Sequence, residues 1–290
     1  MFELKQSICY PGFGAKANED GIGYGRNYCF VMDGASCLSG KNIIDPISDS
    51  AWMTKKVCSG LCELLDREDP RPTGELLRQV IGQVRREYVQ AQEKLGVDAP
   101  EDSPSAGFAL FRLRNGNLEF FGLGDCVGVA KLPNGEDFYA LEENLPKLDQ
   151  QVIRQMVKLR EETGLPILEA KKRCNDLLIA NRNLRNRPGG YWILDLLTDE
   201  SFDNAREESW PLTVPVCVGA LSDGFAQLTE VFSQYAGYPA LFAAMQETDL
   251  EKMYRDLCQM QDADPDCNAY PRFKHGDDTS ALWGVFYPEK

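Results

Sequence analysis

Two Asn-Gly pairs, Asn115-Gly116 and Asn134-Gly135, each lie between apolar runs of this 290-residue chain. Asn-Gly supplies the two positive φ angles of a tight type I′ turn, which joins antiparallel strands. The segments FALFRLR, NLEFFGLGDCVGVAKL and EDFYAL around these pairs are therefore expected to form an antiparallel meander. Further runs rich in β-favouring residues are predicted to be strands: LKQSICY, YCFVMD, LTVPVCVGALSD and TSALWGVF. The pattern favours antiparallel sheets.

Helical periodicity predicts the elements that cover these sheets. It is found at about residues 46–66, 74–95 and 239–260. A further helical stretch, 147–187, is interrupted at residues 163–166, which read Thr-Gly-Leu-Pro. The segment 145–190 around it has ten Lys or Arg and five Asp or Glu, a net charge of +5 in a chain of net charge −14. We expect a single domain over residues 1–290, with 145–190 as an inserted basic helical flap.

The acidic composition limits the expected partners and location. Nucleic acids and anionic membranes repel a chain of net charge −14 over about a Debye length, so neither is an expected partner. No apolar stretch approaches the roughly 18 residues of a membrane span, and the first residues lack a secretory pattern. A cytoplasmic protein is therefore expected, in which the ten cysteines remain thiols.

The residue types that could carry catalysis are restricted by the single histidine, His275. A Ser-His-Asp triad or a two-histidine zinc site needs imidazoles that this chain does not have. A cysteine phosphatase loop needs an arginine six positions after its nucleophile, and none of the ten cysteines has one. Carboxylates and metal ions remain as the candidate chemistry.

Carboxylates beside glycine recur at the ends of the strand-like runs. They are Asp33, Asp125, Asp223, Asp277 and Asp278, to which the string NED adds Glu19 and Asp20. One such site alone is better explained as a turn, since Asp and Gly favour turns. Repeated unpaired carboxylates at strand ends would cost several kcal/mol in desolvation and repulsion unless a cation gathers there, and these strings contain no Lys or Arg. Oxygen ligands alone favour Mg²⁺ or Mn²⁺ over Zn²⁺.

The strings that contain these carboxylates resemble, in chain order, the motifs of the protein phosphatase 2C family, the metal-dependent Ser/Thr phosphatases of PPM type, especially its bacterial members. They are NED at 18–20, VMDG at 31–34, SAG at 105–107, GLGD at 122–125, LSDG at 221–224 and GDDTS at 276–280. The resemblance implies an α+β fold, a four-layer α-β-β-α sandwich of two antiparallel sheets with metals in a cleft at one end.

The resemblance also implies the ligands of two or three Mg²⁺ or Mn²⁺ ions. Asp33 would bridge two ions, and the carbonyl of Gly34 would complete one coordination shell. Asp223 and Asp277 would ligate the other ion, which makes these aspartates and Asp33 the catalytic candidates. Asp125 would hold a third ion together with Asp223.

Glu19 and Asp20 would orient metal-bound waters, and Asp278 is grouped with them as a supporting residue. The implied reaction is phosphomonoester hydrolysis, most simply in phosphorylated proteins, by a metal-bridging hydroxide that attacks phosphorus in line. Two alternatives stay open: a pseudophosphatase that binds partners or regulates a pathway without turnover, and a phosphatase of small metabolites. The substrate and the oligomeric state are not specified by the sequence.

Cationic residues are the candidates for substrate binding. Family members commonly carry a phosphate-binding arginine five residues before the aspartate of the first motif, where this chain has Ala15 followed by Lys16. The clamp is therefore either vacant or taken over by Lys16. The basic insert falls where the family places its variable flap. It is either a solvated helical pair or a flap in which Arg182 and Arg185 help dock a phosphorylated protein.

Overall fold

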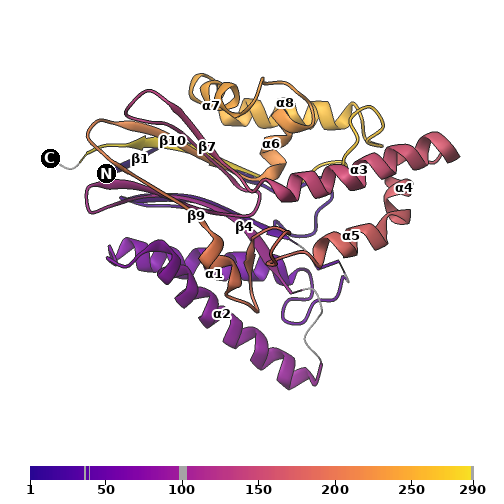
Figure 1. Cartoon of the computed structure of the whole chain (residues 1–290), viewed down its shortest axis with the longest axis horizontal. Coiled ribbons are helices and arrows are strands. Elements are labelled where there is room, and N and C mark those ends of the chain that lie inside the picture. The colour runs from indigo at the N-terminus through magenta and orange to yellow at the C-terminus, as the bar shows by residue number, and fades with distance from the viewer. Residues whose placement is uncertain (36, 39, 98–102, 289–290) are drawn as a thin grey trace.

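Two antiparallel sheets form the centre of the computed structural model, which describes the chain except residues 36, 39, 98–102 and 289–290 (Figure 1). The first sheet has the strand order β1 (Phe2–Tyr10), β11 (Thr279–Phe286), β10 (Val216–Leu221), β6 (Val127–Lys131) and β7 (Asp137–Ala140). The second has the order β2 (Asp20–Tyr24), β3 (Tyr28–Ala35), β4 (Ser105–Arg114), β5 (Asn117–Leu123) and β9 (Arg206–Pro211), with β8 (Leu194–Asp195) beside β4. The prediction of two antiparallel sheets is confirmed.

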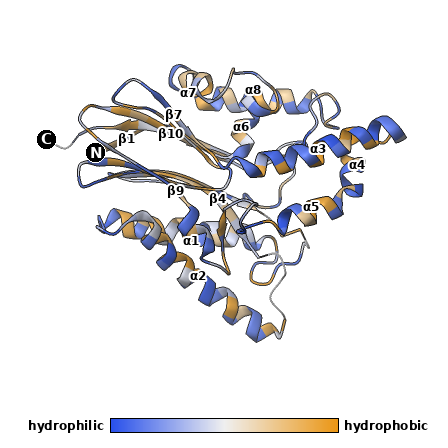
Figure 2. Ribbon diagram, viewed as in Figure 1, coloured by the Kyte–Doolittle hydropathy of each residue, from blue (hydrophilic) through white to orange (hydrophobic). Residues whose placement is uncertain are grey.

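Helices form the two outer layers (Figure 1). The second sheet is covered by α1 (Asp49–Asp66) and α2 (Thr73–Leu95), and the first by α6 (Asp223–Glu230), α7 (Tyr238–Glu247) and α8 (Leu250–Asp262). Figure 2 shows hydrophilic and hydrophobic residues interleaved along these helices, as expected when one face of a helix packs on a sheet. Within the described part of the chain, no helix is both long and apolar enough to span a membrane.

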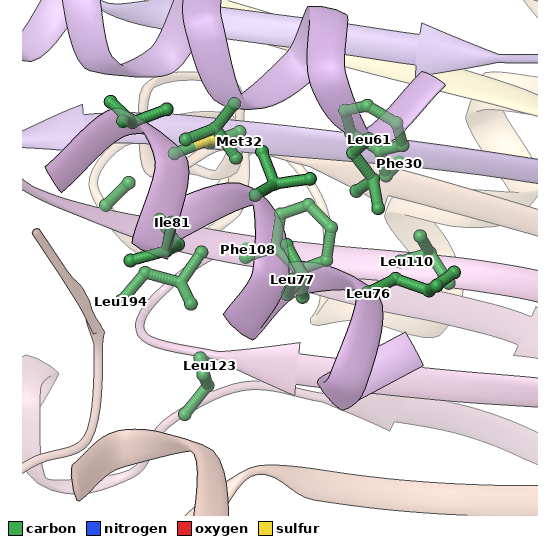
Figure 3. Close-up of a cluster of buried hydrophobic side chains, with 14 of the residues drawn as sticks. Phe30, Met32, Leu61, Leu76, Leu77, Ile81, Phe108, Leu110, Leu123 and Leu194 are labelled. Carbon is green, nitrogen blue, oxygen red and sulfur yellow. The ribbon is translucent and has the colours of Figure 1, made fainter. Parts of the chain in front are cut away.

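Apolar side chains fill the spaces between the layers. One cluster joins α1 and α2 to the second sheet, where Phe30 and Phe108 pack with ring centroids 5.4 Å apart (Figure 3). A second cluster, which includes Val31 and Phe111, lies between the sheets, and a third joins the first sheet to α6, α7 and α8. Each fully buried side chain of this size stabilises the fold by about 1.5–3 kcal/mol, so the strand ends are held on a rigid support.

Helix boundaries follow local capping. Ser48 begins α1 because its side chain accepts a hydrogen bond from the N–H of Ala51 at 3.0 Å. The single helix predicted at 239–260 is two helices, because Thr248 has an extended backbone and Asp249 caps α8. A short polar cap inside an apolar periodic pattern therefore separates α7 from α8.

The predicted meander is wrong in one respect, since its strands belong to two sheets. NLEFFGLGDCVGVAKL is not one strand: β5 lies in the second sheet and β6 in the first, and the chain crosses between them at Gly124-Asp125. Gly124 has φ = 72°, a left-handed conformation that turns the chain out of the sheet. The crossing leaves Asp125 at the end of the sandwich.

The two Asn-Gly turns differ. Asn115 and Gly116 have φ = 52° and 77°, as a type I′ turn requires. In the second pair only Gly135 has a positive φ, 86°, and the N–H of Leu132 donates to the carbonyl of Glu136 at 2.9 Å. The loop is therefore longer than the predicted two-residue turn.

The basic segment forms α3 (Asn144–Thr163), α4 (Ile167–Arg173) and α5 (Asn175–Arg182). These helices lie beyond the end of the sandwich that is opposite to the two termini (Figure 1). Gly164 ends α3 with φ = 74°, as the Gly-Leu-Pro sequence predicted. A small core, which includes Val152, Met156 and Ile167, holds the three helices together, and the division into a domain and an inserted flap stays a prediction.

Candidate active site

Strand ends from both sheets meet next to α3 and α5, and four aspartates from these ends line one cavity of about 310 Å³. Asp33 belongs to β3, and Asp125 lies in the crossing from β5 to β6. Asp223 begins α6 directly after β10, and Asp277 precedes β11. Gly34 also lines the cavity, so the structure brings together all five residues that were predicted as metal ligands. Their role as ligands remains a proposal.

The glycines of the motifs permit this convergence through close packing. A Cβ atom at Gly224, next to Asp223, would lie 1.9 Å from the carbonyl oxygen of Asp278. A Cβ atom at Gly107 would lie 2.6 Å from the Oδ1 atom of Asp125. Both distances are shorter than van der Waals contact, which explains why glycine accompanies the aspartates at these positions.

The carboxylates raise one another's pKa values. Burial raises the pKa of Asp33 well above its usual range, and the charges of Asp20, Asp223 and Asp125 add to the effect. Burial likewise raises the pKa of Asp223, with Asp277 and Asp125 contributing. Burial, with Glu230 and Asp277, raises the pKa of Asp125 to about 6. The cavity is therefore strongly electronegative and favours a bound cation.

The three predicted supporting residues differ in position: Glu19 lines the cavity, whereas Asp20 and Asp278 do not. Asp278 accepts hydrogen bonds from the N–H groups of Gly12, at 2.6 Å, and Glu19, at 2.7 Å. Glu19 lines the cavity and accepts a hydrogen bond from the hydroxyl of Ser48. Asp20 is buried, and neither of its carboxylate oxygens has a hydrogen-bond partner among the described residues.

A lysine that sequence reasoning missed also lines the cavity. Lys274 forms an ion pair with Asp277, three residues further along the chain. Partial burial lowers the pKa of Lys274, but the carboxylates of Asp277, Asp223 and Asp33 outweigh this effect and raise it. The sequence strings around the aspartates contain no Lys or Arg. In the fold, however, Lys274, two residues before the string that begins at Gly276, lies among the carboxylates. The close sequence spacing of the lysine and the aspartate was the available signal.

The three predicted substrate-binding residues separate in space. Arg182, at the end of α5, lines the carboxylate cavity. Lys16 lines a neighbouring cavity of about 280 Å³ instead. The side chain of Arg185 is only 10% exposed, pairs with buried Asp195 at 3.0 Å and donates to the carbonyl of Ser103 at 2.9 Å. These contacts anchor the end of the flap and leave little of Arg185 exposed, and its docking role stays a prediction.

The donor set fits divalent cations of the Mg²⁺ or Mn²⁺ kind. The aspartates and the carbonyl of Gly34 offer only oxygen. Asp20, whose carboxylate has no hydrogen-bond partner among the described residues, is paired with Asp33 between β2 and β3. Within the residues that the structure describes, no three His, Cys, Asp or Glu side chains are already arranged as a metal-binding group. The carboxylates repel one another and Asp277 is paired with Lys274, so ligation would require side-chain adjustment.

No family model and no curated protein matches the sequence. Solved structures do resemble the fold. The serine/threonine phosphatase PstP/Ppp of Mycobacterium tuberculosis has a TM-score of 0.56 at 12% identity, with 100% of both chains covered. The catalytic domain of PstP in complex with two manganese ions has a TM-score of 0.52 at 12% identity, again with 100% of both chains covered. PppA, a regulatory component of T6SS in Pseudomonas aeruginosa, has a TM-score of 0.54 at 13% identity, with 99% of this chain and 97% of that chain covered.

These similarities show that the chain has the protein phosphatase 2C-like fold of the bacterial PPM-type Ser/Thr phosphatases. The predicted four-layer α+β sandwich is thereby confirmed. At this level of identity the similarity establishes the fold, and the activity has to be argued from the cavity itself.

Proposed function

We propose that this chain is a Mg²⁺- or Mn²⁺-dependent phosphomonoester hydrolase that acts on phosphorylated Ser or Thr of proteins. The observation that carries the proposal is the convergence of Asp33, Asp125, Asp223 and Asp277 from separate strand ends into one cavity. A structure of similar fold, the catalytic domain of PstP, contains two manganese ions. The fold and the oxygen donors of the cavity therefore both support metal-dependent hydrolysis of phosphomonoesters.

Two ions would be held by Asp33, the Gly34 carbonyl, Asp223 and Asp277, and a third by Asp125 and Asp223. When bound, such ions lower the pKa of water and neutralise charge on phosphoryl oxygens. The aspartates supply the compensating negative charge, and the two sheets fix the backbone from which they project. Hydrogen bonds to Asp278 hold the segments of Gly12 and Glu19 against this site.

Residues of the flap form the outer wall of the same cavity. Leu145, Asp149, Asn181 and Arg182 line it from α3 and α5. A protein substrate would contact this wall, whereas a small phosphate ester would mainly contact the carboxylate floor. The only histidine of the chain, His275, pairs with Asp262 at 2.9 Å and stacks on Phe13, and it is not a lining residue. Imidazole is therefore not expected to act as the general acid.

The test is hydrolysis of a chromogenic aryl phosphate with Mn²⁺, after EDTA treatment, by the wild type, Asp33→Asn and Asp223→Asn. Asp176→Asn changes an exposed aspartate of α5 and is the matched control. We expect Mn²⁺-dependent turnover in the wild type and the control, and loss of most of it in the two site variants. Near wild-type turnover by Asp33→Asn would refute the site.

Phosphothreonine peptides and small phosphorylated metabolites distinguish the substrate classes. Faster turnover of peptides supports a protein phosphatase, and faster turnover of metabolites contradicts it. Binding of phosphopeptides without turnover of any substrate would identify a pseudophosphatase.

A further inference from the structure

Lys274 lies on the boundary between two cavities. It lines the carboxylate cavity with Asp33 and Asp223, and it also lines the neighbouring cavity formed by residues 12–17. That second cavity contains Ala15, the position at which the sequence resemblance implies a phosphate-binding arginine. Lys274 is thus the cation that connects the position of Ala15 with the carboxylate floor.

The backbone around Lys274 is held firmly. Arg272 is buried, pairs with Asp264 at 2.9 Å and donates to the carbonyl of His275 at 3.1 Å. On the other side of the lysine, Asp278 accepts the N–H of Gly12 at 2.6 Å. These contacts fix the segment against the loop of Ala15, so only the side chain of Lys274 needs to move.

The side chain has room to move, since it is 56% exposed while that of Asp277 is 18% exposed. Lysine carries its charge on a flexible four-carbon stem, and its three donors suit a phosphoryl group as a point charge. An ammonium that pairs with Asp277 lies beside the carboxylates that would hold the cations. A phosphoryl group bound to those cations would come within its reach.

Other cations near the cavity are placed less favourably. Lys16 is exposed and lines only the neighbouring cavity of the two. The Nζ atom of Lys171 donates to the carbonyl of Phe273 at 2.9 Å and lies 5.5 Å from the centre of its ring. Arg182 lines the carboxylate cavity from α5 but, unlike Lys274, does not line the cavity that contains Ala15.

We propose that Lys274 binds the substrate phosphoryl group, leaving Asp277 when a cation and substrate enter the cavity. This inference rests on the proposed phosphatase function, and it replaces the expected arginine by a lysine from a different segment. Lys274 would have two partners in turn: Asp277 before cation binding and a phosphoryl oxygen afterwards. Its removal should therefore weaken phosphate binding without weakening cation binding.

The test compares Lys274→Met, Lys274→Arg and Lys16→Ala with the wild type. Lys172→Met is the matched control, because Lys172 is exposed and forms an ion pair of the same three-residue spacing, with Glu169. The measurements are KM for an aryl phosphate, Ki for inorganic phosphate, binding of radiolabelled phosphate by equilibrium dialysis with Mn²⁺, and the Mn²⁺ dissociation constant from paramagnetic resonance.

For Lys274→Met we expect KM, Ki and the phosphate dissociation constant to rise about tenfold. Mn²⁺ should bind as tightly as in the wild type or more tightly, since a competing cation has been removed. Lys274→Arg should retain phosphate binding within about threefold, and Lys172→Met should not differ from the wild type.

Three results would overturn the inference: changes below twofold in Lys274→Met, weaker binding of Mn²⁺ in parallel with phosphate, or a larger effect of Lys16→Ala. If the wild type turns over substrate and Lys274→Met binds phosphate as the wild type does, this inference is wrong and the proposed function stands. Lys274-dependent phosphate binding without turnover contradicts the proposed function and retains the inference.

Discussion

Asp20 is a buried carboxylate, 7% exposed, and neither oxygen has a hydrogen-bond partner among the described residues. Burial raises its pKa to about 7, and the charges of Asp278 and Asp277 add to the effect. The nearby hydroxyls of Ser222 and Ser280 lower the pKa although neither meets the geometry of a hydrogen bond to Asp20, and they offset only part of the rise. In the absence of a cation, ionised Asp20 should therefore destabilise the folded protein.

The direction in which stability changes with pH follows from proton binding by Asp20. In the unfolded chain the pKa of an aspartate is about 3.9, so the folded state binds the Asp20 proton more tightly. Stability should be highest below about pH 4 as far as this group is concerned, and it should fall as the pH rises to 7. At 1.36 kcal/mol per pH unit, the cost at pH 7 and above is roughly 4 kcal/mol.

The substitution Asp20→Asn tests this effect when the free energy of unfolding is measured with urea in EDTA at pH 5, 6 and 7.5. The asparagine amide is also buried without a partner, which adds a constant cost of about 1–3 kcal/mol at every pH. Between pH 5 and 7.5 the variant should nevertheless gain about 2–3 kcal/mol relative to the wild type. Mn²⁺ should reduce this gain, because a nearby cation stabilises the ionised carboxylate.

Asp176→Asn, at an exposed position, is the control and should follow the wild type at each pH. If the unfolding free energies of the wild type and Asp20→Asn change in parallel from pH 5 to 7.5, Asp20 does not titrate as a buried group. The electrostatic description of the site would then be wrong.

Two other substitutions test the support of the site and its flap. Gly124→Ala places a Cβ atom 2.8 Å from the Cα of Gly107, at a residue with φ = 72°. Thermal unfolding should therefore show a loss of about 1–3 kcal/mol in stability, and Mn²⁺ should bind more weakly because Asp125 is displaced. Unchanged stability would contradict the assigned crossing. Arg182→Glu reverses a charge on the flap wall and should reduce kcat/KM for a phosphopeptide severalfold more than for an aryl phosphate, an effect that salt should diminish; equal losses would remove the docking role.

Much of the sandwich could be predicted from its strands, because their apolar runs are short and bounded by glycine or turn residues. The change of sheet at Gly124 could not, since β5 and β6 are both apolar and an alternating pattern does not specify which sheet a strand joins. The split between α7 and α8 depends on Thr248 and Asp249, whose conformations are set by packing as much as by sequence.

The candidate site was predictable in part for a similar reason. Aspartates at strand ends converge wherever the sheets bring those ends together, so Asp33 and Asp223 could be named in advance. The positions of Lys274 and Arg185 depend on irregular loops, whose paths have no periodic signature. Lys274 lies in a loop that lines the cavity, whereas Arg185 forms a buried ion pair with Asp195 and does not line the cavity.

Whether these aspartates bind the cations of a phosphatase is measured by titrating the EDTA-treated protein with Mn²⁺ and following the titration by paramagnetic resonance. The wild type and Asp176→Asn should bind two or three ions per chain. Asp33→Asn should bind one at most, because the residue proposed to bridge two ions has lost a charged oxygen ligand. Undetectable binding by the wild type, or equal number and affinity of ions in Asp33→Asn, would show that these aspartates do not form the cation site.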